Sequence, residues 1–171
     1  MPVFTPIAHD AFVADVSTLA TAIAADPWRP SYLIGVGRGG LVPAVYLSHA
    51  TGLPTLSCDL SAGVKDFADD VLVRLAQRTR EGERLLFVDD INDSGRTTGL
   101  LRTALDRAGA KTGTIRFAAL IDNAVSRERV DYRARTIDRT VTKDWYIFPW
   151  EAMAPPATIE GDAAEVPDRI A

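Results

Sequence analysis

The chain has few of the residues that form disulfides or bind structural metals. It contains one cysteine, Cys58, and two histidines, His9 and His49, among 171 residues. A single cysteine excludes a disulfide within the chain and is typical of a reducing compartment, so we expect a cytoplasmic protein. Cys58 lies in an apolar stretch, 56–58, and is expected to be a buried thiol rather than a nucleophile. A structural zinc site is not expected from so few ligands.

Long hydrophobic runs and an excess of positive charge are also absent from the sequence. No apolar run approaches the length of about 20 residues that spans a membrane, and the first residues lack the pattern of a secretory signal. The net charge is −4, from 19 lysines and arginines against 23 aspartates and glutamates, which argues against a general nucleic-acid surface. We therefore expect neither membrane nor nucleic acid among the partners.

Residues 1–151 are predicted to form a single domain. Of all residues, 47% are hydrophobic and 25% are charged, as in ordinary globular domains that bury one core. After Glu151 the composition changes to alanine, proline and acidic residues. We predict that this tail, 152–171, is flexible or lies on a neighbouring molecule.

Hydrophobic spacing predicts an alternation of helices and strands. Apolar residues recur at helical spacing in 10–25, in 41–51 and in a segment that ends at Gly109, whereas short β-rich runs predict strands. The predicted strands are 31–36, 55–60, 71–75, 85–88 and 114–121. This alternation predicts the α/β class, with a mainly parallel central sheet flanked by helices. The polar segment 61–70 is expected to be mobile.

The most informative segment is 85–98, which is suited to bind a phosphorylated sugar. Residues 85–88 predict a central strand, and Asp89 and Asp90 follow at its carboxyl end, where open α/β sheets bind ligands. The next turn offers N–H groups, hydroxyls and a cation at the start of a helix, which suits a phosphate. The residues of this turn are Ser94, Gly95, Arg96, Thr97 and Thr98. A capped surface turn is the alternative explanation.

A glycine-rich turn precedes this segment in the chain. The predicted strand 31–36 runs into Gly37, Arg38, Gly39 and Gly40. Glycines let the backbone approach an anion closely, and Arg38 adds a charged, forked set of donors. By itself the turn is equally well explained as a tight connection, but its place before the aspartates favours an anion site.

Aromatic residues gather in a third segment, 144–151. Trp145, Tyr146, Phe148 and Trp150 lie within it, together with a proline. An apolar edge strand that closes the core would explain them on composition alone. Trp150 and Glu151 are assigned to structure.

Together, the three segments resemble the motifs of the type I phosphoribosyltransferases. Segment 85–98 is similar to the motif for phosphoribosyl diphosphate (PRPP), and the glycine-rich turn resembles the pyrophosphate loop. Segment 145–151 resembles the hood of bacterial and archaeal 6-oxopurine phosphoribosyltransferases. The resemblance covers roughly residues 10–151. It implies the type I fold, with a small hood mainly in 122–151 and a flexible active-site loop at about 61–70.

This resemblance implies transfer of a phosphoribosyl group from PRPP to hypoxanthine, guanine or xanthine in purine salvage. Pyrophosphate and a nucleoside monophosphate would be the products, Mg²⁺ the cofactor, and a homodimer or homotetramer the assembly. Two alternatives stay open, namely transfer to another base and a regulatory protein that senses PRPP or nucleotides. The acidic composition and the retained Asp93 favour the enzyme.

The resemblance also assigns roles to residues on the PRPP side. Asp93 would be catalytic and would accept or return the proton at N7 of the base. Asp90, and less directly Asp89, would hold Mg²⁺ as well as the ribose. PRPP would contact Arg38, Gly39, Gly40, Lys65, Asp89, Asp90, Asp93, Ser94, Gly95, Arg96, Thr97 and Thr98. Lys65 would act from the flexible loop, although a solvated surface lysine is the alternative. The peptide bond before Arg38 can be cis in the family.

On the base side, the resemblance points to Asp93, Asn123, Trp145 and Tyr146. Trp145 would stack on the purine, and the backbone of Tyr146 would read its edge. The family usually has a lysine where this chain has Asn123, and an amide, which donates or accepts, discriminates a 6-oxo group less firmly. Lys143 is a possible substitute for that lysine, and Asn123 would then only begin a turn.

Overall fold

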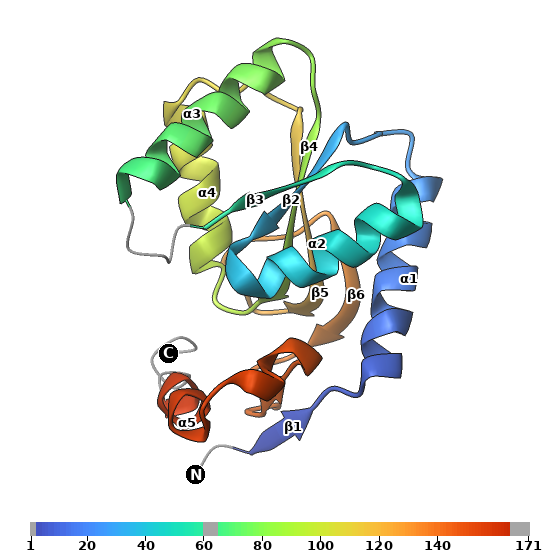
Figure 1. The fold of residues 1–171 in the computed structure, drawn as a ribbon, viewed down its shortest axis with the longest axis vertical. Coiled ribbons are helices and arrows are strands. Elements are labelled where there is room, and N and C mark those ends of the chain that lie inside the picture. The colour runs from blue at the N-terminus through green and yellow to red at the C-terminus, as the bar shows by residue number, and fades with distance from the viewer. Residues whose placement is uncertain (1–2, 60–64, 165–171) are drawn as a thin grey trace.

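The computed structural model describes residues 3–59 and 65–164 of the chain. Within this part, the centre is a parallel sheet of five strands: β2 (Tyr32–Val36), β3 (Thr55–Cys58), β4 (Leu85–Asn92), β5 (Ile115–Asn123) and β6 (Tyr132–Ile137). Their order is β3-β2-β4-β5-β6, so β4 lies in the middle (Figure 1). The register pairs Gly35 with Val88 and Asp89 with Ala119. The carboxyl ends of β2, β4 and β5 therefore share one edge of the sheet.

Helices cover both faces of this sheet. They are α1 (His9–Ala25), α2 (Gly37–Thr51), α3 (Lys65–Arg80) and α4 (Arg96–Arg107). Alternate residues of β4 enter different cores, since Leu86 and Val88 pack with α1 and α2 whereas Leu85 and Phe87 pack with α3 and α4. Burial on both faces explains why the central strands are continuous apolar runs, and the predicted α/β fold is confirmed. In the described part of the chain, no helix is both long and apolar enough to cross a membrane.

A smaller part of the molecule, which we call the hood, faces the carboxyl edge of the sheet (Figure 1). It consists of the parallel strands β1 (Phe4–Pro6) and β7 (Trp145–Ile147), the 3-10 helix η1 (Pro149–Met153) and helix α5 (Pro156–Ala164). The rings of Phe148 and Trp150 stack at 4.7 Å, and Trp150 meets Phe12 of α1 edge-on at 5.2 Å. These aromatic contacts join the hood to the hydrophobic core between α1 and the sheet.

The structure corrects the prediction for the segment after β3. Helix α3 already begins at Lys65, inside the range 61–70 that the sequence predicts to be a mobile loop. Residues 60–64 of that range lie outside the described part, as does the side chain of Lys65. The contact between Lys65 and PRPP therefore stays a prediction.

The strand predicted over 71–75 is wrong, because these residues belong to α3. A run of valine and leucine favours a strand locally, but burial here follows helical spacing. Leu72, Leu75 and Ala76 are buried, whereas Val73 is 54% exposed. A strand would have placed Val73 and Leu75 on the same face.

Two predicted boundaries near the carboxyl terminus are also corrected. The range 122–151 predicted for the hood includes β6, which is an edge strand of the central sheet, whereas β1 at the other end of the chain contributes to the hood. Part of the tail predicted to be flexible forms α5, which begins with a proline, a residue tolerated in the first turn of a helix. Ala163 of α5 is buried.

Candidate active site

The first turn of α2 packs directly against the end of β4. A Cβ at Gly39 would lie 2.3 Å from Oδ2 of Asp90, and a Cβ at Gly40 would lie 2.1 Å from the carbonyl oxygen of Val88. Only glycine permits this approach, which gives the glycine-rich turn a steric reason. The structure thus brings Gly39 and Gly40 against the end of β4, and the side chain of the neighbouring Arg38 is exposed.

The start of α2 differs from the prediction. The helix begins at Gly37, which has a positive φ of 56°, rather than at Leu41. The peptide bond between Gly37 and Arg38 is trans, like the other peptide bonds of the described residues. The reversal of the chain therefore depends on the left-handed conformation of Gly37.

Asp89 and Asp90 form a pair of half-buried carboxyl groups at the end of β4. Burial raises the pKa of both groups, that of Asp89 well above its usual range, and repulsion from Asp90 adds to the shift of Asp89. Hydrogen bonds from the N–H of Asp90 to Asp89 (3.0 Å) and from the N–H of Ile91 to Asp90 (2.7 Å) offset part of this cost. A cation bound at this position would offset more of it.

Glu151 of η1 approaches the same pair, which sequence reasoning missed. Burial raises the pKa of Glu151, and repulsion from Asp90 contributes to the shift. Its Oε2 also accepts a hydrogen bond of 2.7 Å from the N–H of Phe148, so the structural role assigned from the sequence is present too. The described residues contain no group of three or more acidic, histidine or cysteine side chains arranged around one metal position. A divalent cation would therefore need oxygens from water and substrate as well.

The turn before α4 has the features of a phosphate site. Gly95 precedes the helix with φ 82°, and the N–H groups of Thr97 and Thr98 make no hydrogen bond within the described part of the chain. The side chains of Arg96 and Thr97 are exposed. N–H groups at a helix start together with a cation favour an anion.

Thr98 departs from the role predicted for its hydroxyl. The side chain is buried, and its Oγ1 donates a hydrogen bond of 3.1 Å to Oδ1 of Asn92. Asn92 in turn donates to Asp122 and to the carbonyl oxygen of Glu128, each at 2.8 Å. The hydroxyl of Thr98 thus fixes the turn to β4 and β5, so only its backbone N–H is left for an anion.

Asn123 is turned into the protein rather than toward a ligand. Its side chain is 2% exposed, and its Oδ1 accepts hydrogen bonds from the N–H groups of Arg139 (3.1 Å) and Val125 (3.3 Å). Its Nδ2 donates to the carbonyl oxygen of Asp93 at 3.0 Å. These bonds tie together the loops that follow β4, β5 and β6. The structure thus favours the alternative that Asn123 shapes a turn.

Arg139 is the unpredicted member of the site. It follows β6 and is 2% exposed, and its guanidinium holds the carboxylate of Asp93 from Nε (3.0 Å to Oδ1) and Nη2 (2.9 Å to Oδ2). Two parallel charge-assisted bonds fix the orientation of Asp93. No sequence pattern marks Arg139, because it lies 46 residues from Asp93. A basic residue between β6 and the aromatic segment was the only available signal.

The hood side of the site is connected through the same arginine. Nη1 of Arg139 donates to the carbonyl oxygens of Asp144 (2.6 Å) and Thr142 (3.3 Å), and its guanidinium carbon lies 5.5 Å from the ring centre of Tyr146. Trp145 and Tyr146 are half-buried in β7, where they pair with β1. Tyr146 thus lies at the catalytic aspartate predicted from the sequence, with Arg139 between them.

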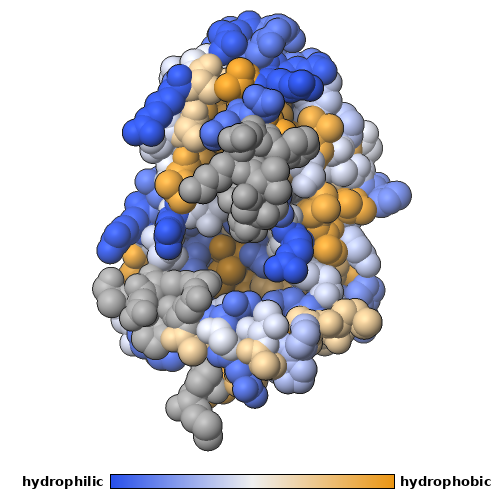
Figure 2. Space-filling model, turned by 60° about the vertical axis from the view of Figure 1, so that its left-hand side comes forward, coloured by the Kyte–Doolittle hydropathy of each residue, from blue (hydrophilic) through white to orange (hydrophobic). Residues whose placement is uncertain are grey.

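The surface shows a recess between the sheet and the hood (Figure 2). Apolar residues form its floor and hydrophilic residues surround it. The carboxyl ends of the strands point toward this region in Figure 1. An apolar floor suits a planar base, and a polar rim suits a charged sugar phosphate.

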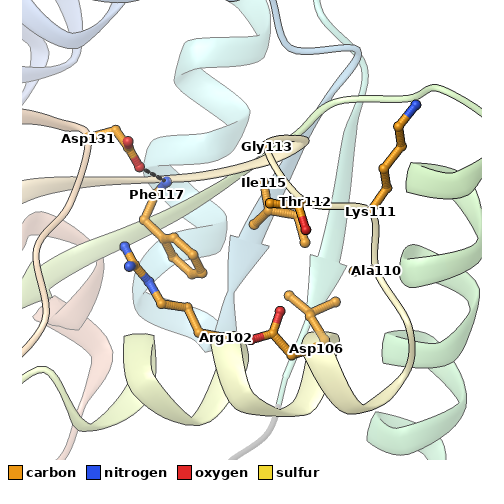
Figure 3. A pocket seen from close by; sticks show the side chains of 10 residues that line it. Arg102, Asp106, Ala110, Lys111, Thr112, Gly113, Ile115, Phe117 and Asp131 are labelled. Carbon is orange, nitrogen blue, oxygen red and sulfur yellow. Dashed lines mark hydrogen bonds between the residues drawn. The ribbon is translucent and has the colours of Figure 1, made fainter.

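A second pocket, of about 280 Å³, lies at the opposite end of the strands (Figure 3). It is lined by residues from the end of α4 and the start of β5, among them Arg102, Asp106, Ile115 and Phe117. The guanidinium of Arg102 lies 4.9 Å from the ring centre of Phe117 and donates to a carbonyl oxygen, so it stabilises the fold there. This pocket contains none of the predicted site residues.

Comparison with known proteins gives the family. The model of the phosphoribosyl transferase domain matches residues 7–155. The chain belongs to this family. It is 31% identical over 132 residues to a xanthine-guanine phosphoribosyltransferase of Cereibacter sphaeroides, which covers 72% of this chain and 70% of that protein.

Solved structures of phosphoribosyltransferases share the fold. A purine phosphoribosyltransferase of Pyrococcus horikoshii is 25% identical, with a TM-score of 0.64 over 88% of this chain and 96% of that chain. The xanthine-guanine-hypoxanthine phosphoribosyltransferase of Helicobacter pylori is 20% identical, with a TM-score of 0.63 over 87% of this chain and 94% of that chain. The predicted type I phosphoribosyltransferase fold is therefore confirmed.

Proposed function

We propose that this phosphoribosyltransferase transfers the 5-phosphoribosyl group of PRPP to a 6-oxopurine, namely hypoxanthine, guanine or xanthine, and releases pyrophosphate. The observation that carries the proposal is the packing of the first turn of α2 against Asp90, at the sheet edge where the turn before α4 also lies. The relatives named above act on purines, which supports a purine as the acceptor.

On the PRPP side, each group of the substrate has a chemically suited partner. The turn Ser94–Thr98 offers free N–H groups and the exposed Arg96 to the 5′-phosphate, and Arg38 with the backbone of Gly39 and Gly40 faces the pyrophosphate. Asp89 and Asp90 accept hydrogen bonds from the ribose hydroxyls. The negative charge that develops on the leaving pyrophosphate is stabilised by Arg38 and by the N–H groups of Gly39 and Gly40.

Mg²⁺ fits the carboxyl pair at the end of β4. The two carboxyl groups have pKa values raised by burial, and the glycine at position 39 leaves room beside Oδ2 of Asp90. Asp90, and less directly Asp89, would hold the ion, and oxygens of water and substrate would complete its coordination. When bound, Mg²⁺ supplies Lewis-acid stabilisation of the pyrophosphate.

On the base side, Asp93 is the acid–base group of the proposal. Its carboxylate is fixed by Arg139, so it accepts a proton from N7 of the incoming base without first having to be oriented. Trp145 of the hood stacks on the base, and the backbone of Tyr146 contacts its edge. The hood thereby excludes water from the reacting atoms.

The wider biological setting belongs to the same proposal. The reaction would take place in the cytoplasm as a step of purine salvage, consistent with the single, buried cysteine. A homodimer or homotetramer is proposed from the family resemblance. A regulatory PRPP sensor is the second candidate, but the fixed orientation of Asp93 favours an enzyme.

The experiment is to measure pyrophosphate release from PRPP and Mg²⁺ with hypoxanthine, guanine, xanthine, adenine, uracil and orotate in turn. Release with at least one 6-oxopurine is the expected result. Release only with another base would correct the acceptor, and no release with any base while PRPP binds in calorimetry would favour the sensor.

A further inference from the structure

The family position that usually carries a lysine cannot select the base in this chain, since Asn123 is 2% exposed and bonded to three backbone groups. Lys143, the other candidate, is exposed, and its charge acts on Asp138. The cation that forms an ion pair with Asp93 is Arg139, whose side chain is 3% exposed and lies against the 16% exposed side chain of Asp93.

We propose that Arg139 is the residue that reads the substituent at C6 of the base, and that it works as a unit with Asp93. This inference rests on the proposed function, because it requires a purine at the site. It deepens that function by assigning the choice between a 6-oxo and a 6-amino purine to a side chain after β6.

The donors of Arg139 are nearly, but not completely, used within the protein. A guanidinium has five N–H donors. The Nε–H bonds to Asp93, the two hydrogens on Nη1 bond to the carbonyl oxygens of Thr142 and Asp144, and one hydrogen on Nη2 bonds to Asp93. The second hydrogen on Nη2 has no partner among the described residues. A buried charged donor without a partner is unfavourable, so an acceptor on a ligand would stabilise this arrangement.

Asp93 provides a matching acceptor beside this donor. Each oxygen of a carboxylate accepts about two hydrogen bonds, and Oδ2 of Asp93 already accepts from Nη2 at 2.9 Å and from Nε at 3.2 Å. Oδ1 accepts from Nε at 3.0 Å and meets Nδ2 of Asn123 only at 3.5 Å, the limit of a hydrogen bond. The single hydrogen on Nε is thus shared and lies closer to Oδ1, so Oδ2, the oxygen next to Nη2, retains capacity for a donor on the base.

An acceptor and a donor side by side select a base edge with the reverse pattern. In a 6-oxopurine protonated at N7, the N7–H donor lies next to the O6 acceptor, and these groups match Asp93 and Arg139. In adenine, the 6-amino group presents hydrogens at the position of O6, so donor would face donor. With adenine, the buried donor of Arg139 would have no acceptor, and a buried polar group left without a partner discriminates strongly against such a substrate.

The test compares two enzymes, the wild type and a variant of Arg139, on two bases, one with a 6-oxo group and one without it. The rates, as kcat/KM, are measured for hypoxanthine and for unsubstituted purine with the wild-type enzyme and with Arg139→Met. We expect the wild type to prefer hypoxanthine by about 100-fold or more, and the variant to lose most of this preference, because the two deletions remove the same hydrogen bond. A preference that Arg139→Met leaves unchanged would overturn the inference.

Further variants separate base reading from a merely structural role. Arg139→Lys keeps a cationic donor and is expected to retain the preference for hypoxanthine over purine, whereas Arg139→Gln is expected to lose it. Equal losses with both bases in all three variants would mean that Arg139 only positions Asp93 and the hood, and the inference would fall. Arg133→Met, an exposed arginine of β6, is the matched control.

The two proposals fail in different ways. If the wild type transfers phosphoribose to no purine, the proposed function fails and this inference fails with it. If the wild type is active and the ratio of rates does not respond to Arg139, only the inference fails. Thermal unfolding of each variant identifies those that do not fold. If Arg139→Met does not fold, Arg139→Gln carries the test, with loss of the preference supporting the inference and an unchanged preference overturning it.

Discussion

The proposed PRPP side of the site and the proposed base side differ in where their groups come from. On the PRPP side, short stretches of chain next to β2 and β4 supply backbone N–H groups, glycines and the pair Asp89 and Asp90. On the base side, four residues meet from the ends of β4, β5 and β6 and from the middle of β7, namely Asp93, Asn123, Arg139 and Tyr146. Contiguous stretches leave a sequence motif, whereas side chains gathered from distant positions do not.

This difference decides which part of the site tolerates change. The PRPP side depends on close backbone packing, so added atoms should damage it. The base side depends on pairs of side chains, so exchanges there should alter selectivity before they abolish the reaction. The following variants test each half against the other, in order of decreasing effect.

Gly39→Ala should have the largest effect. The added Cβ would lie 2.3 Å from Oδ2 of Asp90, so α2 or the aspartate must shift. We expect kcat/KM to fall by about 100-fold or more, with weaker binding of PRPP in calorimetry, because small displacements of positioned groups are costly. Gly161→Ala in α5, where no atom lies within 4 Å of the added group, is the control and should retain activity. Normal PRPP affinity in Gly39→Ala would contradict the packing argument.

Asp93→Asn should remove turnover but spare PRPP. We expect kcat to fall by about 100-fold or more while calorimetry still detects PRPP, since the lost group acts on the base. The exchange also removes the negative charge that pairs with the buried guanidinium of Arg139, so the melting temperature of the variant should fall. Unchanged turnover would remove Asp93 as the acid–base group.

Asp89→Asn should stabilise the fold at neutral pH while it impairs catalysis. Burial raises the pKa of Asp89 above the value of 3.8 in an unfolded chain. As the pH rises above 3.8, the unfolded chain loses its proton first, and the folded state becomes less stable until its own raised pKa is passed. The variant lacks this penalty, so it should be more stable than the wild type near neutral pH and equally stable in acid.

A carboxyl group with the opposite shift provides the control for this experiment. Hydrogen bonds from the N–H of Trp28 and from Arg116 lower the pKa of Asp26. Asp26→Asn should therefore lose stability at neutral pH and approach the wild type as the pH falls below 3.8. Stability curves with the same sign for both variants would contradict the assignment.

Asn123→Ala should have the smallest effect on the choice of base. Three hydrogen bonds of the side chain to backbone groups are lost, so we expect the free energy of unfolding to fall by about 1–3 kcal/mol. The ratio of rates with hypoxanthine and adenine should stay within a few-fold of the wild type. A large change in this ratio would return Asn123 to the base site.

The sequence predicts the PRPP half well because its physics is local. The alternation of apolar runs and helical spacing predicts the strands and helices next to these motifs, and the glycine-rich turn directly follows its own strand. The contacts that require glycine at 39 and 40 are made with β4 and become visible only in the structure. The misassigned segment 71–75 shows the limit of local propensity, because burial against β-strands decided in favour of a helix.

The base half could be predicted only in part, because its geometry depends on tertiary contacts. Asn123 occupies the position expected from the motif, but nothing in the neighbouring residues shows that its amide turns toward the loop after β6. Arg139 becomes part of the site only when β6 is placed beside β5, and β6 itself was not predicted. Alternate exposed and half-buried residues in β6 give only a weak strand signal.

The most direct measurement is analysis of the products after incubation with PRPP, Mg²⁺ and hypoxanthine. The account predicts equal amounts of pyrophosphate and a nucleoside 5′-monophosphate in the wild type, and initial rates of formation of both products lower by about 100-fold or more in Gly39→Ala. Release of pyrophosphate with ribose 5-phosphate and no nucleotide would contradict it, because the hood and the pair of Asp93 with Arg139 would then not hold a base.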